Sequence, residues 1–452
     1  MSVAAKLVLI SLEHKEREFQ AKVLLAQELA SRGYKVLLGP TEVIDKVALL
    51  VKGAIYLHKS QHPNAVKFIR RGNFFCILDE EGGITTPRST LREFCRSRYS
   101  NASSENTTLI LLPGLPYLRE LEKLPQLIGV EKRVTGWPRV DLWQSEFRGV
   151  HGLATSEIMQ KHGDFYLLIS SFGGGSEARI QRIIQEASSD AWKKILLHRL
   201  AGFRMYVAMI EDLCRSYLGE NETLIVRPHP SEPIHEWKDT LDGIPKVKVL
   251  RDGDLTPWIL ASKGTIHFGS TAVTQSVVLG KSVVQYRVKE SKGITDTPSF
   301  ELPVNARTTK EIYSSLSAEA GTLTRQLRLA ESRMARELDF RSGMFAYKKV
   351  ADALDDLNGP FEVEELTTLQ KVRVKLFSNA LWAASFLKSQ LRGSGFLKTH
   401  LKTVYENLPG GIRVAEARSL ILQIEDQLEV KREHRVSNFA RNVILIEREL
   451  AD

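Results

Sequence analysis

The sequence predicts an α/β protein with two parallel sheets in succession, followed by an all-helical C-terminal appendage. Short apolar runs alternate with amphipathic stretches up to about residue 350, and this alternation is typical of βαβ units whose sheet is covered on both faces. The alternation pauses between residues 132 and 164 and then restarts, and the expected strands stop after about residue 359. We therefore expect domains over residues 1–150, 151–358 and 359–452.

The first predicted domain opens with a buried strand at residues 6–10. Residues 19–32 carry apolar side chains at helical spacing, and Gly33 follows at the position where glycine commonly ends a helix. The next strands of this domain are expected at residues 35–38, 53–57, 74–78 and 108–112.

The second predicted domain repeats this pattern. A strand at residues 165–169 leads into a glycine-rich loop at 170–176, and a long helix covers about 193–218. Its other strands are expected at residues 223–226, 247–250, 264–268 and 282–286.

The composition indicates a soluble, cytoplasmic protein. With 43% hydrophobic and 26% charged residues among 452, the chain has ordinary globular composition. Its three cysteines are scattered and predict neither a disulfide framework nor a zinc site. The start of the chain lacks the features of a secretory signal, and the longest apolar run, residues 376–387, is too short to span a bilayer. The net charge of +9 favours an anionic partner without identifying it.

Polar side chains follow several of the expected strands, at the edge of a parallel sheet where ligands bind. Asp79, Glu80 and Glu81 come directly after the strand at 74–78, with glycines at 82 and 83. Adjacent acids repel one another, which tends to raise the pKa of at least one of them toward the range of a general base. The alternative is a solvated turn, because acids and glycines are common in loops.

A second polar segment, Arg227-Pro-His229-Pro230, follows the strand at 223–226. The two prolines fix the backbone around His229, and a rigid histidine beside Arg227 suits a phosphate group. Glu232 lies just beyond and is a candidate nucleophile. The alternative is a stiffened turn whose histidine faces solvent.

Two further segments predict a nucleotide or phosphate site in the second domain. Gly269, Ser270 and Thr271 lie between a strand and a helix start, where hydroxyl and backbone N–H groups can hold an anion. Gly174 and Ser176 belong to the loop after the strand at 165–169, whose spacing fits neither a dinucleotide fingerprint nor a P-loop. Asp252 and Asp254 are spaced like a metal-binding acid pair, but we expect no metal site.

With these segments in place, the chain resembles GT-B-type glycosyltransferases, and more narrowly the bacterial surface-carbohydrate proteins related to CMP-sialic acid and CMP-Kdo transferases. That family carries a D/E-D/E-G motif, matched here by Glu80, Glu81 and glycine 82, and a His-Pro motif, matched by His229 and Pro230. The segment 135–141, Thr-Gly-Trp-Pro-Arg-Val-Asp, resembles the stretch with which such proteins enter their second domain. The resemblance covers about residues 5–350.

The resemblance implies two Rossmann-like domains facing each other, an acceptor domain first and a nucleotide-sugar donor domain second. It implies transfer of an ulosonic acid, Kdo or a sialic-acid-like sugar, from a CMP-activated donor to a glycan or lipid-linked glycan, without a metal ion or other cofactor. By the same pattern Glu81 is the first choice for the base and Glu80 the second. His229 would contact the donor phosphate, Ser270 and Thr271 would hold its oxygens, and Arg227 would add charge.

Other functions fit the same sequence features. A CDP-glycerol glycerophosphotransferase, a UDP-sugar-using GT-B enzyme and a UDP-sugar epimerase share this two-sheet architecture. A non-catalytic, membrane-associated scaffold is the alternative outside the enzymes.

The predicted appendage is basic as well as helical. Residues 366–405 hold seven Lys and Arg residues and no Asp or Glu, interleaved with large apolar side chains. This pattern fits a helix at an anionic membrane surface, peripheral to the inner face of the cytoplasmic membrane, although amphipathic helices more commonly pack within a protein. Packing within the protein, or against another copy in a homo-oligomer, is the alternative. We expect no nucleic-acid partner.

Overall fold

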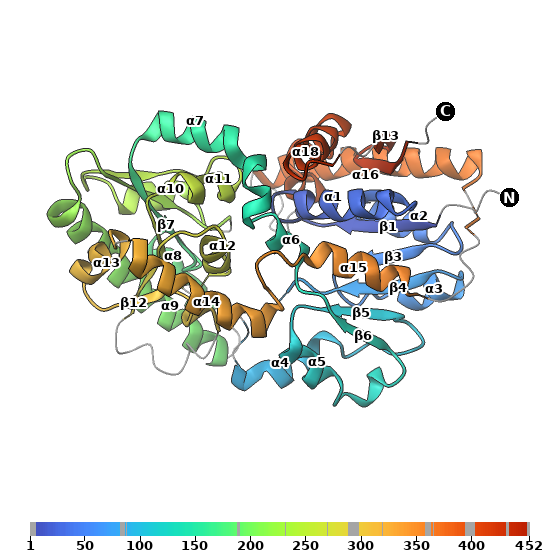
Figure 1. The fold of residues 1–452 in the computed structure, drawn as a ribbon, viewed down its shortest axis with the longest axis horizontal. Helices are drawn as coiled ribbons and strands as arrows, with labels where there is room; N and C mark the ends of the chain where they lie inside the picture. The colour runs from blue at the N-terminus through green and yellow to red at the C-terminus, as the bar shows by residue number, and fades with distance from the viewer. Residues whose placement is uncertain are drawn as a thin grey trace. The chain divides into compact units, whose positions relative to one another are not determined.

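The computed structural model contains two compact units, each built around its own sheet (Figure 1). Unit 1 comprises Met1–Glu81, Arg92–Leu142 and Ser342–Asp452, and unit 2 comprises Gly82–Leu91 and Trp143–Arg341. The prediction of an α/β protein with two parallel sheets is confirmed. The structure describes residues 6–81, 86, 88–187, 190–230, 232–268, 270–287, 298–318, 320–357, 363–364, 366–393, 403–430 and 434–449.

The sheet of unit 1 has a parallel body. Within the described residues its strand order is β13-β14-β2-β1-β3-β4-β5-β6, and β2 through β6 run parallel to β1. All six residues of β1 are buried, as expected for a strand covered on both faces. The bounds are β1 Leu7–Leu12, β2 Lys35–Pro40, β3 Ile55–His58, β4 Phe74–Leu78, β5 Leu109–Leu112, β6 Glu131–Val134, β13 His434–Ala440 and β14 Val443–Arg448.

The C-terminal segment contributes strands, so the prediction that residues 359–452 are all helical is wrong. β13 and β14 form an antiparallel hairpin, and β14 pairs antiparallel with β2. Asn442, in the turn between them, has a φ of 60°, the left-handed conformation that tight hairpin turns favour. The apolar run at 443–446 is too short for periodicity to separate a buried strand from a helix. The hairpin covers the edge that β2 would otherwise expose.

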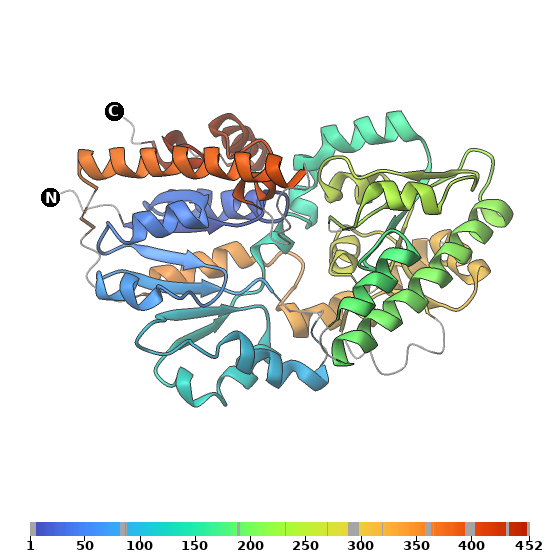
Figure 2. The same ribbon diagram turned by 180° about the vertical axis from the view of Figure 1, so that it is seen from behind.

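Helices cover both faces of this sheet (Figures 1 and 2). On one side α1 packs beside α6, α15 and α18, and on the other α2 packs beside α16. The bounds in unit 1 are α1 Lys15–Ser31, α2 Thr41–Ala48, α3 Ala65–Arg70, α4 Leu91–Arg98, α5 Leu115–Leu121, α6 Pro138–Asp141, α15 Ala346–Asp355, α16 Thr368–Gly393, α17 Val404–Asn407 and α18 Val414–Gln427.

Unit 2 has a parallel sheet in the order β12-β11-β10-β7-β8-β9 within the described residues. Its strands are β7 Phe165–Ile169, β8 Thr223–Arg227, β9 Val247–Val249, β10 Thr265–His267, β11 Val283–Tyr286 and β12 Val304–Ala306. Its helices are α7 Gly152–His162, α8 Glu177–Glu186, α9 Asp190–Asp212, α10 Ile234–Thr240, α11 Leu255–Ala261, α12 Ala272–Val278, α13 Thr309–Leu316 and α14 Ala320–Leu338.

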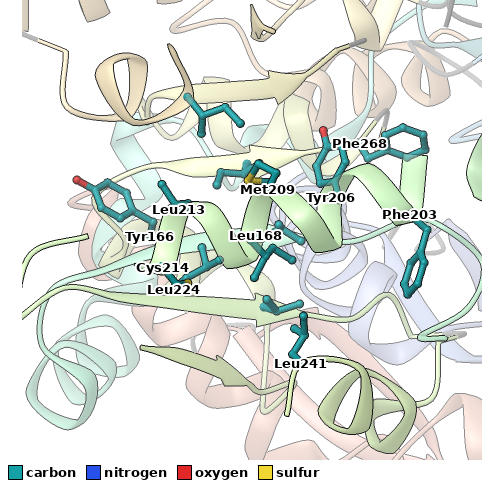
Figure 3. Close-up of a cluster of buried hydrophobic side chains, with 14 of the residues drawn as sticks. Tyr166, Leu168, Phe203, Tyr206, Met209, Leu213, Cys214, Leu224, Leu241 and Phe268 are labelled. Atoms are coloured by element: carbon teal, nitrogen blue, oxygen red, sulfur yellow. The ribbon is translucent and has the colours of Figure 1, made fainter. Parts of the chain in front are cut away.

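The long helix α9 lies on this sheet through a buried aromatic and aliphatic cluster (Figure 3). The Tyr206 hydroxyl donates to the carbonyl of His267 and accepts from the Tyr286 N–H at 3.0 Å. Gly202 allows the close approach, because a Cβ there would lie 2.6 Å from Cζ of Phe268. These contacts fix α9 against the carboxyl end of β10.

The C-terminal hairpin makes a first prediction. Ile446 on β14 is fully buried, so Ile446→Ala should lower the free energy of unfolding of unit 1 by about 2–5 kcal/mol. Leu445 points to the other face and is only half-buried, so Leu445→Ala is the matched control and should cost less. Urea unfolding of both variants measures the difference. No loss at Ile446 would show that the hairpin is not part of the cooperative fold.

Candidate functional site

The carboxyl edge of the first sheet gathers charged side chains. The chain runs from β1 to β2 and then to β3 on the other side of β1, and ligands of parallel sheets bind where the strand order reverses in this way. At this reversal Lys59, after β3, forms an ion pair with Glu13, after β1. Because β4 pairs with β3, the turn at 79–81 lies on the same edge.

The three acids of this turn have different environments, and Asp79 is the structural one. It is fully buried, and its two carboxylate oxygens accept from Nε and Nη2 of Arg98, each at 2.6 Å. The Tyr99 hydroxyl and the Glu81 N–H, at 3.0 Å, donate to the same carboxylate. A carboxylate that accepts hydrogen bonds from all these donors is fixed in position. The geometry therefore does not support the prediction that Asp79 is catalytic.

Glu80 is the acid with the properties of a general base. Its side chain is 8% exposed, and its Oε1 is buried without a hydrogen-bond partner within the described part of the chain. Burial raises the pKa of Glu80, while the charges of Arg139 and Lys22 partly oppose that rise. A carboxyl that is buried, unpaired at one oxygen and more basic than usual has properties that a general base needs.

Glu81, the first choice from the sequence, is more accessible. Its side chain is 39% exposed, and its Oε1 lies 3.7 Å from Nη2 of Arg17. The glycines at 82 and 83, which complete the family motif, lie outside the described residues. Its role as the base therefore stays a prediction, and the contrast in burial ranks Glu80 above it.

The segment 135–141 holds the acidic turn in place. Nε1 of Trp137 donates to the carbonyl of Asp79 at 3.0 Å, and Nη2 of Arg139 donates to the carbonyl of Glu80, also at 3.0 Å. Asp141 accepts from the N–H groups of Ala346 and Tyr347, at 3.0 and 2.8 Å, at the start of α15. This segment thus supports the backbone of the acidic turn and anchors the start of α15.

The second sheet has its own strand-order reversal, between β7 and β10. Here the Ser171 hydroxyl, after β7, donates to the carbonyl of Phe268, after β10, so the two loops meet. The loop after β8 joins them through Ser170, whose hydroxyl accepts from the His229 N–H at 3.0 Å. Three strand ends predicted to carry a ligand site therefore lie together in unit 2.

Glu232 is the internal support of these loops. It is 1% exposed and accepts from the Ser170 hydroxyl, the Gly173 N–H at 2.8 Å and the Trp237 Nε1–H at 2.9 Å. A carboxylate buried and hydrogen-bonded in this way orders the loops, and the geometry does not favour it as a nucleophile.

Arg227 also has a structural place. Its guanidinium donates to the carbonyl oxygens of Asp252, at 2.8 Å, and Gly253, and lies 5.6 Å above the ring of Trp258. The side chain is 8% exposed. Two of its N–H groups are thus directed to backbone carbonyls, and the expectation that it adds charge at the phosphate stays a prediction.

The remaining candidates differ in what they offer a ligand. His229, Pro230 and Thr271 are exposed, and the half-buried Ser270 accepts from the Ala272 N–H at 3.2 Å, so the start of α12 is tied to its own backbone. Gly269 lies outside the described residues.

The glycine-rich loop is explained by packing. The Ser176 hydroxyl accepts from the Arg179 N–H at 3.3 Å and donates to Glu236 at 3.1 Å, capping α8. A Cβ at Gly174 would lie 3.0 Å from Cγ1 of Ile180, and one at Gly175 only 2.7 Å from the Trp237 ring. Gly174 and Ser176 therefore have structural roles that account for their identity.

A cation that the sequence did not single out lies beside this loop. Arg199, on α9, is half-buried, and its Nη1 is 3.4 Å from where a Cβ on Gly173 would be. Burial lowers the pKa of its guanidinium, and the charge of Glu232 opposes this. The neighbouring His198 stacks on Phe268 at 5.6 Å, and its Nε2 is buried without a partner in the described chain. No sequence motif identifies Arg199 as a candidate, because helical spacing alone does not show which loops a side chain contacts.

Comparisons with known proteins find likeness of fold. No protein-family model matches the sequence, and no curated protein matches it either. Alr3699/HepE of Anabaena, solved with UDP and glucose, is 12% identical with a TM-score of 0.45, over 78% of this chain and 100% of that one. A putative UDP-N-acetylglucosamine 2-epimerase of Listeria monocytogenes is 11% identical with a TM-score of 0.46, over 78% and 96%. The wall teichoic acid polymerase TagF, soaked with CDPG, is 9% identical with a TM-score of 0.46, over 77% and 88%.

The buried carboxyl of Glu80 makes a prediction about stability. Because the folded-state pKa is raised above the usual value of 4.5, the folded protein binds the proton more tightly than the unfolded chain. The free energy of unfolding therefore falls as pH rises from about 4.5 through the raised pKa, by about 1.4 kcal/mol for each tenfold difference in proton affinity. In Glu80→Gln there is no carboxyl at this position to lose its proton, so the variant avoids this decrease in the free energy of unfolding. It should be more stable than wild type at neutral pH and should lose that advantage below pH 4.5.

Thermal or urea unfolding at several pH values measures this difference. Glu81→Gln is the matched control, since it makes the same change at the neighbouring acid, whose side chain is 39% exposed. A Glu80→Gln variant that is less stable than wild type at neutral pH would mean that the carboxylate is stabilised by contacts and not strained by burial.

Proposed function

We propose that the chain is a GT-B-type glycosyltransferase that uses a nucleotide-activated sugar, with unit 1 as the acceptor domain and unit 2 as the donor domain. The observation that carries this proposal is Glu80, a buried carboxyl with a raised pKa and one unpartnered oxygen at the carboxyl edge of a parallel sheet. The loops gathered at the strand-order reversal of unit 2 supply the second half of the argument, since nucleotides bind parallel sheets there.

In this proposal Glu80 is the general base. It takes the proton of an acceptor hydroxyl while that oxygen attacks the anomeric carbon of the donor sugar. The bond between the anomeric carbon and the phosphate oxygen breaks, and the nucleotide leaves with the bonding electrons. Lys22 and Arg139 lie near enough to offset part of the charge that Glu80 carries before it takes the proton.

The leaving phosphate needs positive charge and hydrogen-bond donors. We assign the charge to Arg199, in place of Arg227, which donates from both terminal nitrogens to carbonyl oxygens of a later loop. His229, exposed at the end of β8, and the hydroxyls of Ser270 and Thr271 are the proposed donors. The proposal needs no metal ion or other cofactor.

The identity of the donor nucleotide is the more specific part of the proposal. The sequence resemblance points to a CMP-activated ulosonic acid, such as Kdo or a sialic-acid-like sugar. The solved proteins of similar fold are named with UDP, UDP-glucose or CDPG. These comparisons favour the alternative, a UDP-sugar or a CDP-linked donor such as CDP-glycerol. With CDP-glycerol the acceptor oxygen would attack the phosphorus that carries glycerol, in place of an anomeric carbon, and CMP would leave. The glycan or lipid-linked acceptor belongs to the same proposal.

Replacing the base should separate chemistry from binding. Glu80→Gln keeps the shape of the side chain but cannot take a proton, so transfer should fall by about 10²–10⁴-fold while nucleotide binding is retained. Glu81→Gln is the control. Donor turnover with each nucleotide sugar in turn measures both. Loss in Glu81→Gln alone would move the base by one residue, and full activity in both variants would favour the non-catalytic scaffold.

Replacing the proposed phosphate ligands should weaken nucleotide binding. Arg199→Gln should raise the dissociation constant for the preferred nucleotide by about 10–100-fold, since it removes a charge-assisted hydrogen bond. Calorimetric titration with UDP, CDP and CMP also ranks the donors. Arg204→Gln, on the same helix but paired with Glu177 at the surface, should bind normally. His229→Ala should mainly reduce turnover, and an unchanged affinity in Arg199→Gln would remove Arg199 from the site.

A further inference from the structure

Only a narrow side of α16 faces unit 1. Val374, Ser378, Trp382 and Ser385 are buried, three or four residues apart along the helix. The Ser378 hydroxyl donates to the carbonyl of Arg441 in the β13–β14 turn, and the Arg441 guanidinium lies 5.7 Å above the Trp382 ring. These contacts fix the rotation of the helix about its axis, and Figure 2 shows it as the long orange helix along the outside of unit 1.

The opposite side of α16 is an exposed apolar stripe. Its large members are Leu369 and Leu387, both 60% exposed, Leu376, 64% exposed, and Val372 and Leu391, both 46% exposed. The exposed residues Ala380 and Ala383 fill the two intervening positions. We call these residues the outer face of α16: Leu369, Val372, Leu376, Ala380, Ala383, Leu387 and Leu391.

The outer face of α16 differs from isolated leucines on a protein surface because its members are continuous. Its members recur every three or four residues, so a helix places them in one row of about 33 Å, at 1.5 Å per residue. Phe377 and Phe386, 38% and 40% exposed, widen the row at its sides. Isolated exposed apolar residues need no explanation, but a continuous row marks a surface that another apolar phase covers.

The positively charged side chains of α16 indicate what kind of apolar surface covers the outer face. By the 100° turn of a helix, Lys375 and Lys388 lie on the two flanks of the outer face and Arg373 lies at its edge. Lys371 lies toward the side of the buried residues. All four are exposed, and among the described residues none forms an ion pair. The sequence from 366 to 405 has no acid that could neutralise them. A second copy of α16 would bring like charges together, whereas an anionic surface would pair with the three cations that border the outer face, Arg373, Lys375 and Lys388.

We propose that the outer face of α16 docks the protein onto an anionic lipid bilayer, with the helix lying in the plane of the interface. The aliphatic side chains enter the boundary between headgroups and acyl chains, and the lysine stems extend along it to place their ammonium groups at lipid phosphates. Within the part of the chain that the structure describes, no helix is long and apolar enough to cross a bilayer. Attachment by α16 is therefore interfacial, and it does not depend on the proposed transferase activity.

Vesicle co-sedimentation of the full-length protein tests the proposal. Wild type should sediment with phosphatidylcholine vesicles that contain phosphatidylglycerol, and far less with phosphatidylcholine alone. Leu376→Ser combined with Leu387→Ser should lower the partition coefficient by about tenfold or more, because two apolar side chains are removed from the interface. Arg373→Gln with Lys375→Gln and Lys388→Gln should abolish the preference for anionic lipid, and salt should weaken wild-type binding.

The control variants carry serine at exposed leucines elsewhere. Leu153, on α7, is 77% exposed and Leu422, on α18, is 58% exposed, so Leu153→Ser and Leu422→Ser should bind vesicles like wild type. All these positions are at the surface, and circular dichroism should show unchanged folding. Equal sedimentation of wild type and the Leu376/Leu387 variant, or none by wild type, would overturn the proposal. So would a dimer that the same two substitutions dissociate, since a second copy would then cover the face.

Discussion

The buried carboxylate of Asp79 is the constraint on which the arrangement of the first site depends. An ionised carboxyl inside a protein persists only with compensating donors, and Arg98, Tyr99 and the backbone of residue 81 supply them. Because Asp79 is fixed at the end of β4, the backbone of Glu80, the next residue, also has a defined position. The turn is then closed from outside by Trp137 and Arg139, which donate to the carbonyls of residues 79 and 80.

Buried carboxylates serve opposite purposes in this molecule. Asp79 and Glu232 are saturated with hydrogen bonds and order the loops around them. Glu80 is nearly as buried but keeps an oxygen without a partner in the described chain. Saturated carboxylates hold a structure, whereas an unsaturated one retains the capacity to react, and this difference is the physical basis for choosing among the acids.

The sequence was sufficient for the central strands of both sheets and for the sheet edges where polar residues collect, but the strands β6 and β12 at the ends of the two sheets were not predicted. The buried strands ending at Leu78 and Arg227 follow from short apolar runs between helical stretches, and the polar residues after them do lie at carboxyl ends. The roles of those residues were not predictable, because chain order does not say which of three adjacent acids turns inward or that Arg227 meets the carbonyls of a later loop. Arg199 was missed for the same reason, and the hairpin after residue 434 because its apolar run is too short to reveal its period.

The antiparallel pairing of β14 with β2 has a consequence for synthesis on the ribosome. Unit 2 lies almost wholly between residues 143 and 341, so its sheet can form as soon as that stretch has emerged. The sheet of unit 1 needs strands from both ends of the sequence, and its closing contacts span about four hundred residues. During translation the edge of β2 therefore stays unpaired until the β13–β14 hairpin has been synthesised. Until then this exposed strand edge can pair with strands of other nascent chains.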